Sequence, residues 1–532
     1  MAKTTAYPII PLPGRVDLGD GEFLLNKDNV IVVDDANQWN ASYLQRAIQD
    51  QTQFRLSVVP FPAIAGPRIQ LVIEDSLESN PEGYQLTVSN TGVLISAKTE
   101  IGCFYGIQTL RQLLPVKIKT KGSEAASIPC MAIQDRPCFT WRGLMLDEGR
   151  YFHGKATVLR LLDVMALLKM NVFHWHLTED QGWRLEIKKY PKLTEIGSRG
   201  PGTAQTITQT IRNQHDNVSQ SGFYTQEEIR EIIAYAQERH ILVVPEIEMP
   251  GHSTAALAAY PELGCTGKQT SPGTRFGIFK DVFCPGKERT FTFIEDVLLE
   301  VMALFPSPYI HIGGDEAPRS RWKKCPRCQE RIAREGLQNE HQLQEYFTNR
   351  IAGFLENHNR QLVGWNEILS DNLHRNAVAQ YWVGSRKSLL EGMHQGRKVI
   401  ISSYLNYYLD HSYWLTPLSK SYNFYPEFPE LTDAETGNLL GVEAPLWSEF
   451  VPDWARLEYQ TFPRLLAVAE TGWTSKSQKN YADFFARYNH FKSHLKAMGI
   501  RCPKDEEVEP SRIQQAFGVF TIILPQRKTC EH

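Results

Sequence analysis

The 532-residue sequence lacks an apolar run long enough to cross a membrane. No stretch approaches the roughly 18–20 apolar residues that a membrane-spanning helix requires. The first residues, MAKTTAYPIIPLPGR, also lack the continuous apolar segment of a signal peptide. The chain is therefore either cytoplasmic or begins after a removed signal. Of the two we expect the second, an extracytoplasmic protein that is periplasmic or secreted.

An excess of charge of either sign is missing as well. Lys and Arg number 57 and Asp and Glu number 60, which leaves a formal net charge of −3. Proteins that bind nucleic acid usually carry a clear positive excess, at least on one face. Nucleic acid is therefore not an expected partner.

Cysteine is scarce: the chain has nine, an odd number that leaves at least one thiol free or paired with another chain. Cys265 and Cys284 enclose a segment rich in Gly, Pro and Ser, a loop that a disulfide could close. Cys325 and Cys328 form a single C-x-x-C, and a zinc site would need two further ligands at suitable spacing, which the nearby sequence does not offer. We therefore expect two ordinary thiols there, and neither a metal nor a cofactor.

Aromatic residues, in contrast, are plentiful, with 11 Trp and 21 Tyr in a chain of otherwise globular composition. Such rings can fill a large core, or they can line a sugar-binding cleft as flat apolar platforms. Composition alone leaves both interpretations open.

The length predicts more than one domain. Residues 1–135 alternate short β-rich runs with one strong helical pattern at 101–114, which predicts a small α+β domain of structural, non-catalytic role. The segment 128–137 is predicted to be the linker that leaves this domain. We expect a catalytic domain over 136–505 and a C-terminal tail over 506–532.

Eight apolar segments of the second region predict strands, and amphipathic helical patterns such as 156–170 and 225–240 lie between most of them. Eight βα units over about 350 residues fit a (β/α)8 barrel. The predicted strands are 140–150, 171–180, 241–252, 309–316, 361–367, 377–384, 399–410 and 439–449.

Acidic residues and tryptophans follow nearly every one of these strands, in the runs DEGR, HWHLTED, EIEMPGH, GGDE, WNE, W, YLD and WSE. Barrel active sites are built from such positions at the carboxyl ends of the strands. Carboxylates that move protons, beside aromatic walls that hold a sugar ring, are typical of glycoside hydrolysis. The sequence therefore predicts a glycosidase site.

Asp315 and Glu316 are adjacent in HIGGDEAP, which makes them awkward as the usual opposed acid and nucleophile of a retaining glycosidase. Their placement suits a reaction in which the 2-acetamido oxygen of the substrate attacks the anomeric carbon. One acid would then protonate the leaving group, and the other would orient the acetamido nitrogen.

HIGGDE resembles the H-x-G-G-D-E signature of the β-N-acetylhexosaminidases of glycoside hydrolase family 20. The similarity extends over most of 139–500: it includes WRGLMLDEGRYF, NVFHWHLTEDQGWR, EIEMPGHS, VGWNE, YLD, LWSE and PRLLAVAETGW, in the family's order. It implies an exo-acting enzyme that removes terminal β-linked GlcNAc or GalNAc from oligosaccharides or glycoconjugates, with retention and through an oxazoline intermediate.

The resemblance implies a role for each residue that matches a motif. Glu316 is expected to be the general acid and then the base, and Asp315 to hold the acetamido N–H while Tyr408 donates to the acetamido oxygen. His252 is expected to contact Glu316 and to lean on a carboxylate of HLTED. The family often has Asp at the first acidic position after HLT, whereas this chain has Glu179 followed by Asp180, so either one could support His252.

Substrate-binding roles follow in the same way. Arg150 is expected to bind ring hydroxyls, and Asp410 and Glu449 to take the remaining ones. His176 is expected to belong to the site, whereas His174 is expected to be a hydrogen-bonded interior group. The walls of the acetamido pocket are expected to be Trp365, Trp382 and Trp447. Trp414 follows YLD at a spacing that differs from the family's, and its role stays open.

Two other classes of function compete with this interpretation. A metal-dependent barrel hydrolase could use the H-x-H pair with His252, His311 and nearby carboxylates. A non-catalytic carbohydrate-binding barrel would keep the aromatic walls and Arg150. The sequence leaves open the GlcNAc or GalNAc preference, the aglycone and the oligomeric state, for which a homo-oligomer is one possibility.

Overall fold

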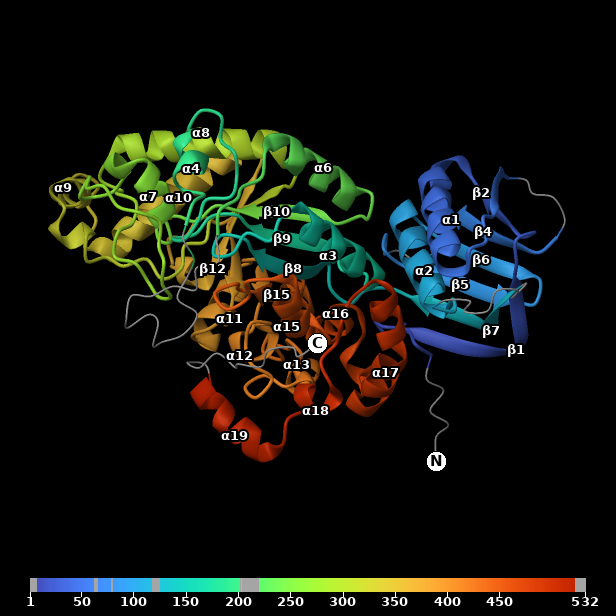
Figure 1. Ribbon diagram of the computed structural model, residues 1–532. Coiled ribbons are helices and arrows are strands. Elements are labelled where there is room, and N and C mark those ends of the chain that lie inside the picture. The colour runs from blue at the N-terminus through green and yellow to red at the C-terminus, as the bar shows by residue number, and fades with distance from the viewer. Residues whose placement is uncertain are drawn as a thin grey trace.

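The computed structural model describes residues 7–61, 66–77, 80–116, 125–200, 202 and 220–521. The chain forms a mixed sheet with two helices at its N-terminal end and a closed barrel that carries the remainder (Figure 1). The predicted fold class, a barrel preceded by a small α+β domain, is confirmed. Within the described residues no helix is long and apolar enough to cross a membrane.

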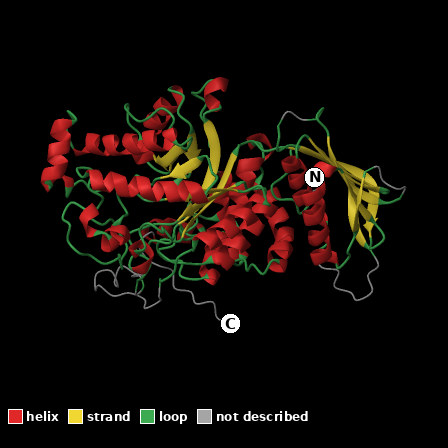
Figure 2. Cartoon of the chain, turned by 90° about the horizontal axis from the view of Figure 1, so that it is seen from above, coloured by secondary structure: helices red, strands yellow, loops and turns green. Residues whose placement is uncertain are grey.

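The N-terminal sheet has seven strands in the order β1-β7-β5-β6-β4-β2-β3. Helices α1 (Gln38–Thr52) and α2 (Glu100–Leu113) cover its face toward the barrel, and α2 packs on barrel helix α3 (Lys155–Leu167) (Figure 2). The strands are β1 (Arg15–Leu25), β2 (Val30–Val33), β3 (Ser57–Pro60), β4 (Arg68–Ile73), β5 (Tyr84–Ser89), β6 (Gly92–Ala97) and β7 (Ala126–Asp135).

The prediction of a linker at 128–137 is wrong, because most of that segment is strand β7. This strand pairs antiparallel with both β1 and β5, so it lies inside the sheet. Pro129 suggested a break, since proline cannot donate to a ladder. It is tolerated here because it stands opposite Glu22, where the β1 register shifts and the ladder is already interrupted.

The barrel closes through eight parallel strands in sequence order, and each of them overlaps one of the predicted strands. The observed strands are shorter than predicted, because the polar residues at their ends belong to the loops of the barrel mouth. The strands are β8 (Trp141–Asp147), β9 (Val172–His176), β10 (Leu242–Glu246), β11 (Tyr309–His311), β12 (Gln361–Trp365), β13 (Val378–Tyr381), β14 (Val399–Ile401) and β15 (Leu439–Leu446).

Helices surround this barrel and carry the return connections. Helix α16, which contains all but the first residue of the segment PRLLAVAETGW, is buried along its whole length. The longer ones are α3, α6 (Gln226–Gln237), α8 (Glu288–Leu304), α9 (Pro326–Arg334), α10 (Glu340–Asn357), α11 (Arg386–His394), α15 (Trp454–Thr461), α16 (Arg464–Trp473) and α17 (Tyr481–Ala497). Short helices lie in the loops: α4 (Lys192–Glu195), α7 (Thr254–Ala259), α12 (Tyr404–Tyr407), α13 (Leu418–Asn423) and α14 (Asp433–Thr436).

The C-terminal tail predicted for 506–532 is only partly described. Helix α18 (Asp505–Val508) and helix α19 (Arg512–Thr521) follow the barrel, and residues 522–532 lie outside the described part of the chain. The predicted domain limits at 135/136 and 505/506 stay predictions.

The barrel interior changes from apolar to charged toward the mouth. Successive side chains along a strand point to opposite faces. In β9, Val172 and His174 therefore face the barrel interior, whereas Phe173 and Trp175 face outward and pack in the main hydrophobic core. The His174 ring is held between two buried carboxylates, with Nδ1 2.7 Å from Glu443 Oε1 and Nε2 3.0 Å from Glu246 Oε2. His174 is therefore an interior hydrogen-bonded group below the mouth.

Candidate active site

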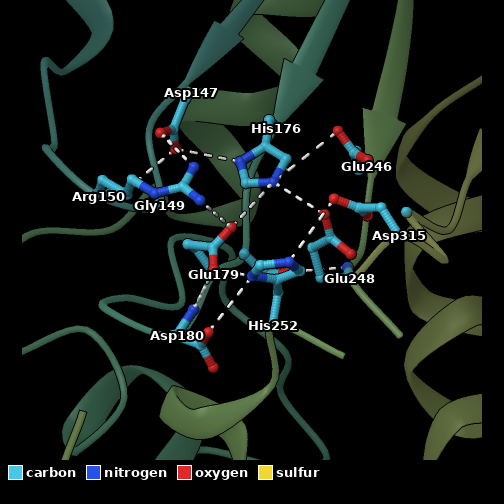
Figure 3. Close-up of polar contacts among 12 residues, drawn as sticks. Asp147, Gly149, Arg150, His176, Glu179, Asp180, Glu246, Glu248, His252 and Asp315 are labelled. Atoms are coloured by element: carbon cyan, nitrogen blue, oxygen red, sulfur yellow. Dashed lines mark hydrogen bonds and ion pairs between the residues drawn. The ribbon is translucent and has the colours of Figure 1, made fainter. Parts of the chain in front are cut away.

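The residues predicted to act together meet at the carboxyl end of the barrel. Figure 3 shows the side chains that follow β8, β9, β10 and β11 converging around the rings of His176 and His252. Loops after β12, β13, β14 and β15 complete the mouth with aromatic residues and further acids.

A tight turn, rather than a strand, carries the adjacent acids. Strand β11 ends at His311, and the backbone then takes positive φ at Gly313 (66°), Gly314 (91°) and Glu316 (44°). Because residues beyond the strand no longer alternate between its two faces, both acids can reach the same site. A side chain at Gly313 would also collide with Glu248, whose Oε2 lies 1.7 Å from an ideal Cβ position.

The two acids have different environments. Asp315 is 9% exposed, and its Oδ1 has no hydrogen-bond partner among the described residues. Burial raises the pKa of Asp315 to about 7, and Glu367, Glu246 and Glu179 add to the shift while His252 opposes it. The Glu316 side chain is 38% exposed. One acid is thus enclosed with a free acceptor atom, and the other is open to an incoming group.

His252 connects these acids to a buried carboxylate. Its Nε2 lies 3.6 Å from Asp315 Oδ2 and 3.7 Å from Glu316 Oε2, and its Nδ1 lies 2.7 Å from Glu179 Oε1 (Figure 3). Although burial disfavours the charged ring, Glu179 and Asp315 hold the pKa of His252 well above its usual range. The charged form of the ring is therefore favoured between Glu179 on one side and the two adjacent acids on the other.

Glu179, rather than Asp180, makes the shorter contact with His252. Asp180 Oδ2 lies 3.3 Å from the same Nδ1, and its Oδ1 accepts from the backbone N–H of Thr254 at 2.9 Å. That second bond places Asp180 at the first turn of α7, where a carboxylate satisfies free N–H groups. Glu179 faces the site and Asp180 holds the neighbouring helix.

Arg150 is the centre of a buried ion network beside His252. Its guanidinium lies 2.9 Å from Asp147 Oδ2, 3.1 Å from Glu179 Oε2 and 3.2 Å from Glu449 Oε1. It also lies over the Trp447 ring, with its carbon 5.0 Å from the ring centroid. Burial disfavours the cation, but the three carboxylates hold the pKa of Arg150 well above its usual range.

Four aromatic rings form a continuous wall at the barrel mouth. Trp365 and Trp447 have centroids 5.6 Å apart, Tyr408 lies 6.4 Å from Trp447, and Trp382 stacks on Tyr408 at 6.0 Å. Trp382 Nε1 donates to both oxygens of Glu367, at 3.1 and 3.0 Å. The three predicted tryptophans and Tyr408 therefore stand together.

Comparison with known proteins gives the same picture over nearly the whole chain. Residues 139–476 match the model of glycosyl hydrolase family 20, catalytic domain, and residues 6–136 match that of glycosyl hydrolase family 20, domain 2. The chain belongs to glycosyl hydrolase family 20.

Relatives within the family cover most of this chain. A beta-hexosaminidase of Porphyromonas gingivalis is 38% identical over 92% of the chain, which spans 64% of that relative's length. A beta-hexosaminidase of Akkermansia muciniphila is 32% identical over 86% of the chain and 94% of its own length.

Solved family 20 structures have the same fold. The exo β-N-acetylglucosaminidase of Vibrio harveyi, in complex with N-acetylglucosamine, superposes with a TM-score of 0.83 at 31% identity, over 94% of this chain and 78% of that one. The β-N-acetylhexosaminidase of Bacteroides fragilis superposes with a TM-score of 0.81 at 32% identity, over 95% and 99% of the two chains.

Asp410, like Asp315, has a carboxylate oxygen in this family 20 site that is available to accept a hydrogen bond. Its Oδ1 is buried without a hydrogen-bond partner in the described part of the chain, and burial together with Glu449 raises its pKa to about 8. The strand predicted to reach Asp410 in fact ends at Ile401, and helix α12 intervenes. Trp414, further along this loop, is half-buried.

His176 lies deeper in the mouth than the sequence suggested. Its Nδ1 is 3.1 Å from Asp147 Oδ1, its Nε2 is 3.3 Å from Glu248 Oε1, and its ring meets Trp447 edge-on at 5.1 Å. It contacts the residues that line the site and is itself fully buried.

Three acids of the site were missed in the sequence: Asp147, Glu248 and Glu367. Burial, Asp315 and Glu246 raise the pKa of Glu248 well above its usual range, which favours the neutral carboxyl beside Asp315. A signal for it existed: in EIEMPGH the spacing of two residues puts Glu246 and Glu248 on one inward face.

Proposed function

We propose that this family 20 chain is an exo-acting β-N-acetylhexosaminidase that hydrolyses terminal β-linked GlcNAc or GalNAc with retention, using the substrate's own acetamido group as the nucleophile. The observation that carries the proposal is the contrast between Asp315 and Glu316. Asp315 is enclosed and has a free acceptor oxygen, whereas the adjacent Glu316 is open to an incoming group.

In the first step, Glu316 donates its proton to the glycosidic oxygen while the bond from this oxygen to the anomeric carbon breaks. The acetamido carbonyl oxygen attacks the same carbon and forms an oxazolinium ring. Asp315 accepts a hydrogen bond from the acetamido N–H and stabilises the positive charge that develops on this group, as a preorganised group does at a transition state. Tyr408 donates its hydroxyl to the acetamido oxygen and orients it.

In the second step, the Glu316 carboxylate takes a proton from water, and the water oxygen attacks the anomeric carbon as the ring opens. Two inversions at one carbon give net retention. The His252 cation lies within 3.7 Å of both Asp315 and Glu316, so it offsets the negative charge of these acids in both steps.

Arg150, Asp410 and Glu449 bind the hydroxyls of the terminal sugar, and the wall of Trp365, Trp382 and Trp447 packs against its apolar face and acetamido methyl. Arg150 is held rigid by its carboxylate partners, which makes its planar fork of donors a precise hydroxyl ligand. How these groups meet an axial or equatorial 4-hydroxyl sets the GlcNAc or GalNAc preference.

A panel of aryl β-glycosides with and without the 2-acetamido group tests this function. We expect turnover of the N-acetylglucosaminide or N-acetylgalactosaminide and loss of nearly all turnover for the matched glucoside and galactoside. Asp315→Asn should lower kcat by about 10²–10³-fold. Glu316→Gln should lower it by about 10²–10⁴-fold, and least for the best leaving groups. Equal turnover of the paired glycosides would contradict the mechanism.

Two histidines that the competing metal-dependent hydrolase would use, His174 and His176, are less suited to binding a metal, whereas burial lowers the pKa of His311. Although burial disfavours a charged ring, Glu443 and Glu246 raise the pKa of His174 to about 9. Glu246 and Asp147 likewise hold that of His176 above its usual range against the effect of burial. A protonated imidazole has no lone pair for a metal. A non-catalytic sugar-binding barrel would leave Glu316 and its contact with His252 without a role.

The proposal includes the predicted homo-oligomer, in which a second copy of the chain would contribute residues to the barrel mouth. Light scattering on the purified protein at several concentrations tests it, and a constant monomer mass would rule it out.

A further inference from the structure

Four cysteines that are far apart in the sequence meet beside the barrel mouth. Cys265 and Cys284 stand in the connection between β10 and α8, and Cys325 and Cys328 stand at the start of α9, after β11. Their sulfur atoms lie 3.8 Å apart for Cys265 and Cys328, 3.7 Å for Cys284 and Cys325, and 3.5 Å for Cys284 and Cys328.

These distances do not fit disulfides. A disulfide joins its sulfurs at about 2.05 Å, and all four cysteines are free thiols in the structure, so the bridge considered between Cys265 and Cys284 is absent from it. Four thiolates around one zinc ion, each at about 2.3 Å in a tetrahedron, stand about 3.8 Å from one another. The measured separations match this second geometry.

The surroundings of the cluster are built closely around it. Cys284, Cys325 and Cys328 are buried, and with Val282, Trp322 and Leu343 they form a small apolar core separate from the main one. Gly286 fits against the α9 backbone so tightly that a Cβ there would lie 2.3 Å from the carbonyl carbon of Arg327.

We propose that Cys265, Cys284, Cys325 and Cys328 bind one zinc ion as a structural tetrathiolate site. Each side of the site contributes two thiolates, and Cys325 and Cys328 have the spacing that zinc sites favour. Lys323 and Lys324 add positive charge to the segment just before Cys325, whereas the charge of Arg321 there is paired with Asp281. Nothing in the hydrolase chemistry requires this ion.

The position of the four-cysteine cluster indicates its structural role. The β10 connection carries His252, and the β11 connection carries Asp315 and Glu316. The cluster joins the two connections on the outer side, together with the bond from Trp322 Nε1 to the Phe283 carbonyl at 2.9 Å. Phe283 in turn donates its N–H to the Pro250 carbonyl at 3.0 Å, two residues before His252. The zinc would therefore hold the loop of the histidine against the loop of the acids.

Metal analysis of the purified full-length protein tests the proposal. We expect one zinc ion per chain, released when a mercurial reagent blocks the thiols. Cys328→Ser should lose the zinc, whereas the matched control Cys138→Ser, an exposed cysteine outside the cluster, should keep it. Absence of zinc from the wild-type protein, or equal zinc in both variants, would overturn the proposal.

Cobalt replacement keeps the test decisive if Cys328→Ser does not fold. Protein supplied with Co²⁺ should show the visible absorption of a tetrahedral tetrathiolate, and Cys265→His should retain the metal with shifted bands, because zinc and cobalt sites accept Cys3His sets. No such absorption, or an intact mass lower by the hydrogens lost in disulfide formation, would contradict the site. These readouts do not depend on the proposed hydrolase activity.

Discussion

At the scale of single residues, Asp315 combines two properties that pull in opposite directions. Its free Oδ1 must accept a hydrogen bond from the acetamido N–H and offset the positive charge that develops there, so the reaction needs the ionised form. Burial, however, raises its pKa to about 7, which favours the neutral form. The enclosure that sharpens recognition of the acetamido group therefore also limits the pH range in which it works.

The resulting pH dependence can be measured. Because the active form is deprotonated, kcat/KM, which reports on the free enzyme, should fall as the pH drops below about 7, by roughly tenfold per pH unit. In kcat the limb should move to lower pH, since the acetamido N–H stabilises the carboxylate. Asp315→Asn should lose this limb altogether. The same limb in that variant would assign it to another group.

Glu179 and Asp180 are adjacent in the chain, but their contacts in the structure give them different roles. Glu179→Gln should lower kcat by about 10²-fold or more, since it removes the charge that holds the His252 cation and one partner of Arg150. Asp180→Ala should lower the melting temperature, in line with about 1 kcal/mol for a lost helix cap, with a smaller effect on kcat. Kinetics and thermal melts of both variants measure the contrast; equal kcat values would remove it.

Much of the site could be predicted at this scale because its members follow strands. Glu316, Arg150 and Trp447 each follow a strand directly enough to be placed at the mouth. The choice between Glu179 and Asp180 could not be predicted, because it depends on how the loop after His176 turns back at the isolated bridge between Thr178 and Trp183. Local sequence does not determine that turn.

At the scale of elements, the turn after β11 is the piece that gives the adjacent acids their shared site. Its geometry depends on Gly313, which has φ 66° and no room for a Cβ beside Glu248. Any other residue there must both adopt a left-handed backbone and displace a buried carboxyl group.

Gly313→Ala and Gly336→Ala form a matched pair that separates these two costs. Gly336, just after α9, has φ 67° with nothing within 4 Å of its Cβ position. Both variants should lose about 1–2 kcal/mol from the left-handed backbone. Only Gly313→Ala should lose activity as well, by at least about tenfold, as Glu248 moves and Asp315 with it. Denaturant unfolding and steady-state kinetics give both values; unchanged kinetics in Gly313→Ala would show that the turn tolerates the shift.

The elements of the barrel were easier to predict than those of the N-terminal sheet. The barrel strands are short continuous apolar runs between long helices, and all eight were found. Strand β1 was missed because most of its residues are exposed, so it has no apolar alternation. Helix α1 was missed because its apolar residues are mixed with Asn40 and other polar groups that are nevertheless buried against α2.

At the scale of the whole molecule, buried ion pairs join the N-terminal domain to the barrel. Asp135, the last residue of β7, lies 2.8 Å from Lys169 Nζ and accepts from Trp473 Nε1 at 2.8 Å. Arg142 on β8 reaches Glu82 at 2.7 Å across the same boundary. Since charges buried in this way need their partners, the barrel depends on the N-terminal domain for its own stability.

Asp135→Asn tests this dependence. It leaves the fully buried Lys169 without its counter-ion, so we expect a loss of about 3–5 kcal/mol in unfolding free energy. Calorimetry should show one lowered transition. The control Asp17→Asn, which breaks an exposed pair with Arg15, should leave the melting temperature unchanged. An unaffected transition in Asp135→Asn would mean that the domains are stable independently.

The four-cysteine cluster also has a consequence for how inhibition by chelators should be interpreted. Three of the four sulfur ligands, Cys284, Cys325 and Cys328, are buried and Cys265 is half-buried, so a chelator should act slowly, at a rate set largely by local unfolding around the ion. Activity would then decline over time and faster on warming, although no step of the proposed hydrolysis uses a metal. Loss of activity after a single incubation with chelator would therefore suggest a catalytic metal. A slow, temperature-dependent time course would instead indicate that removal of a structural ion unfolds the loops around the site.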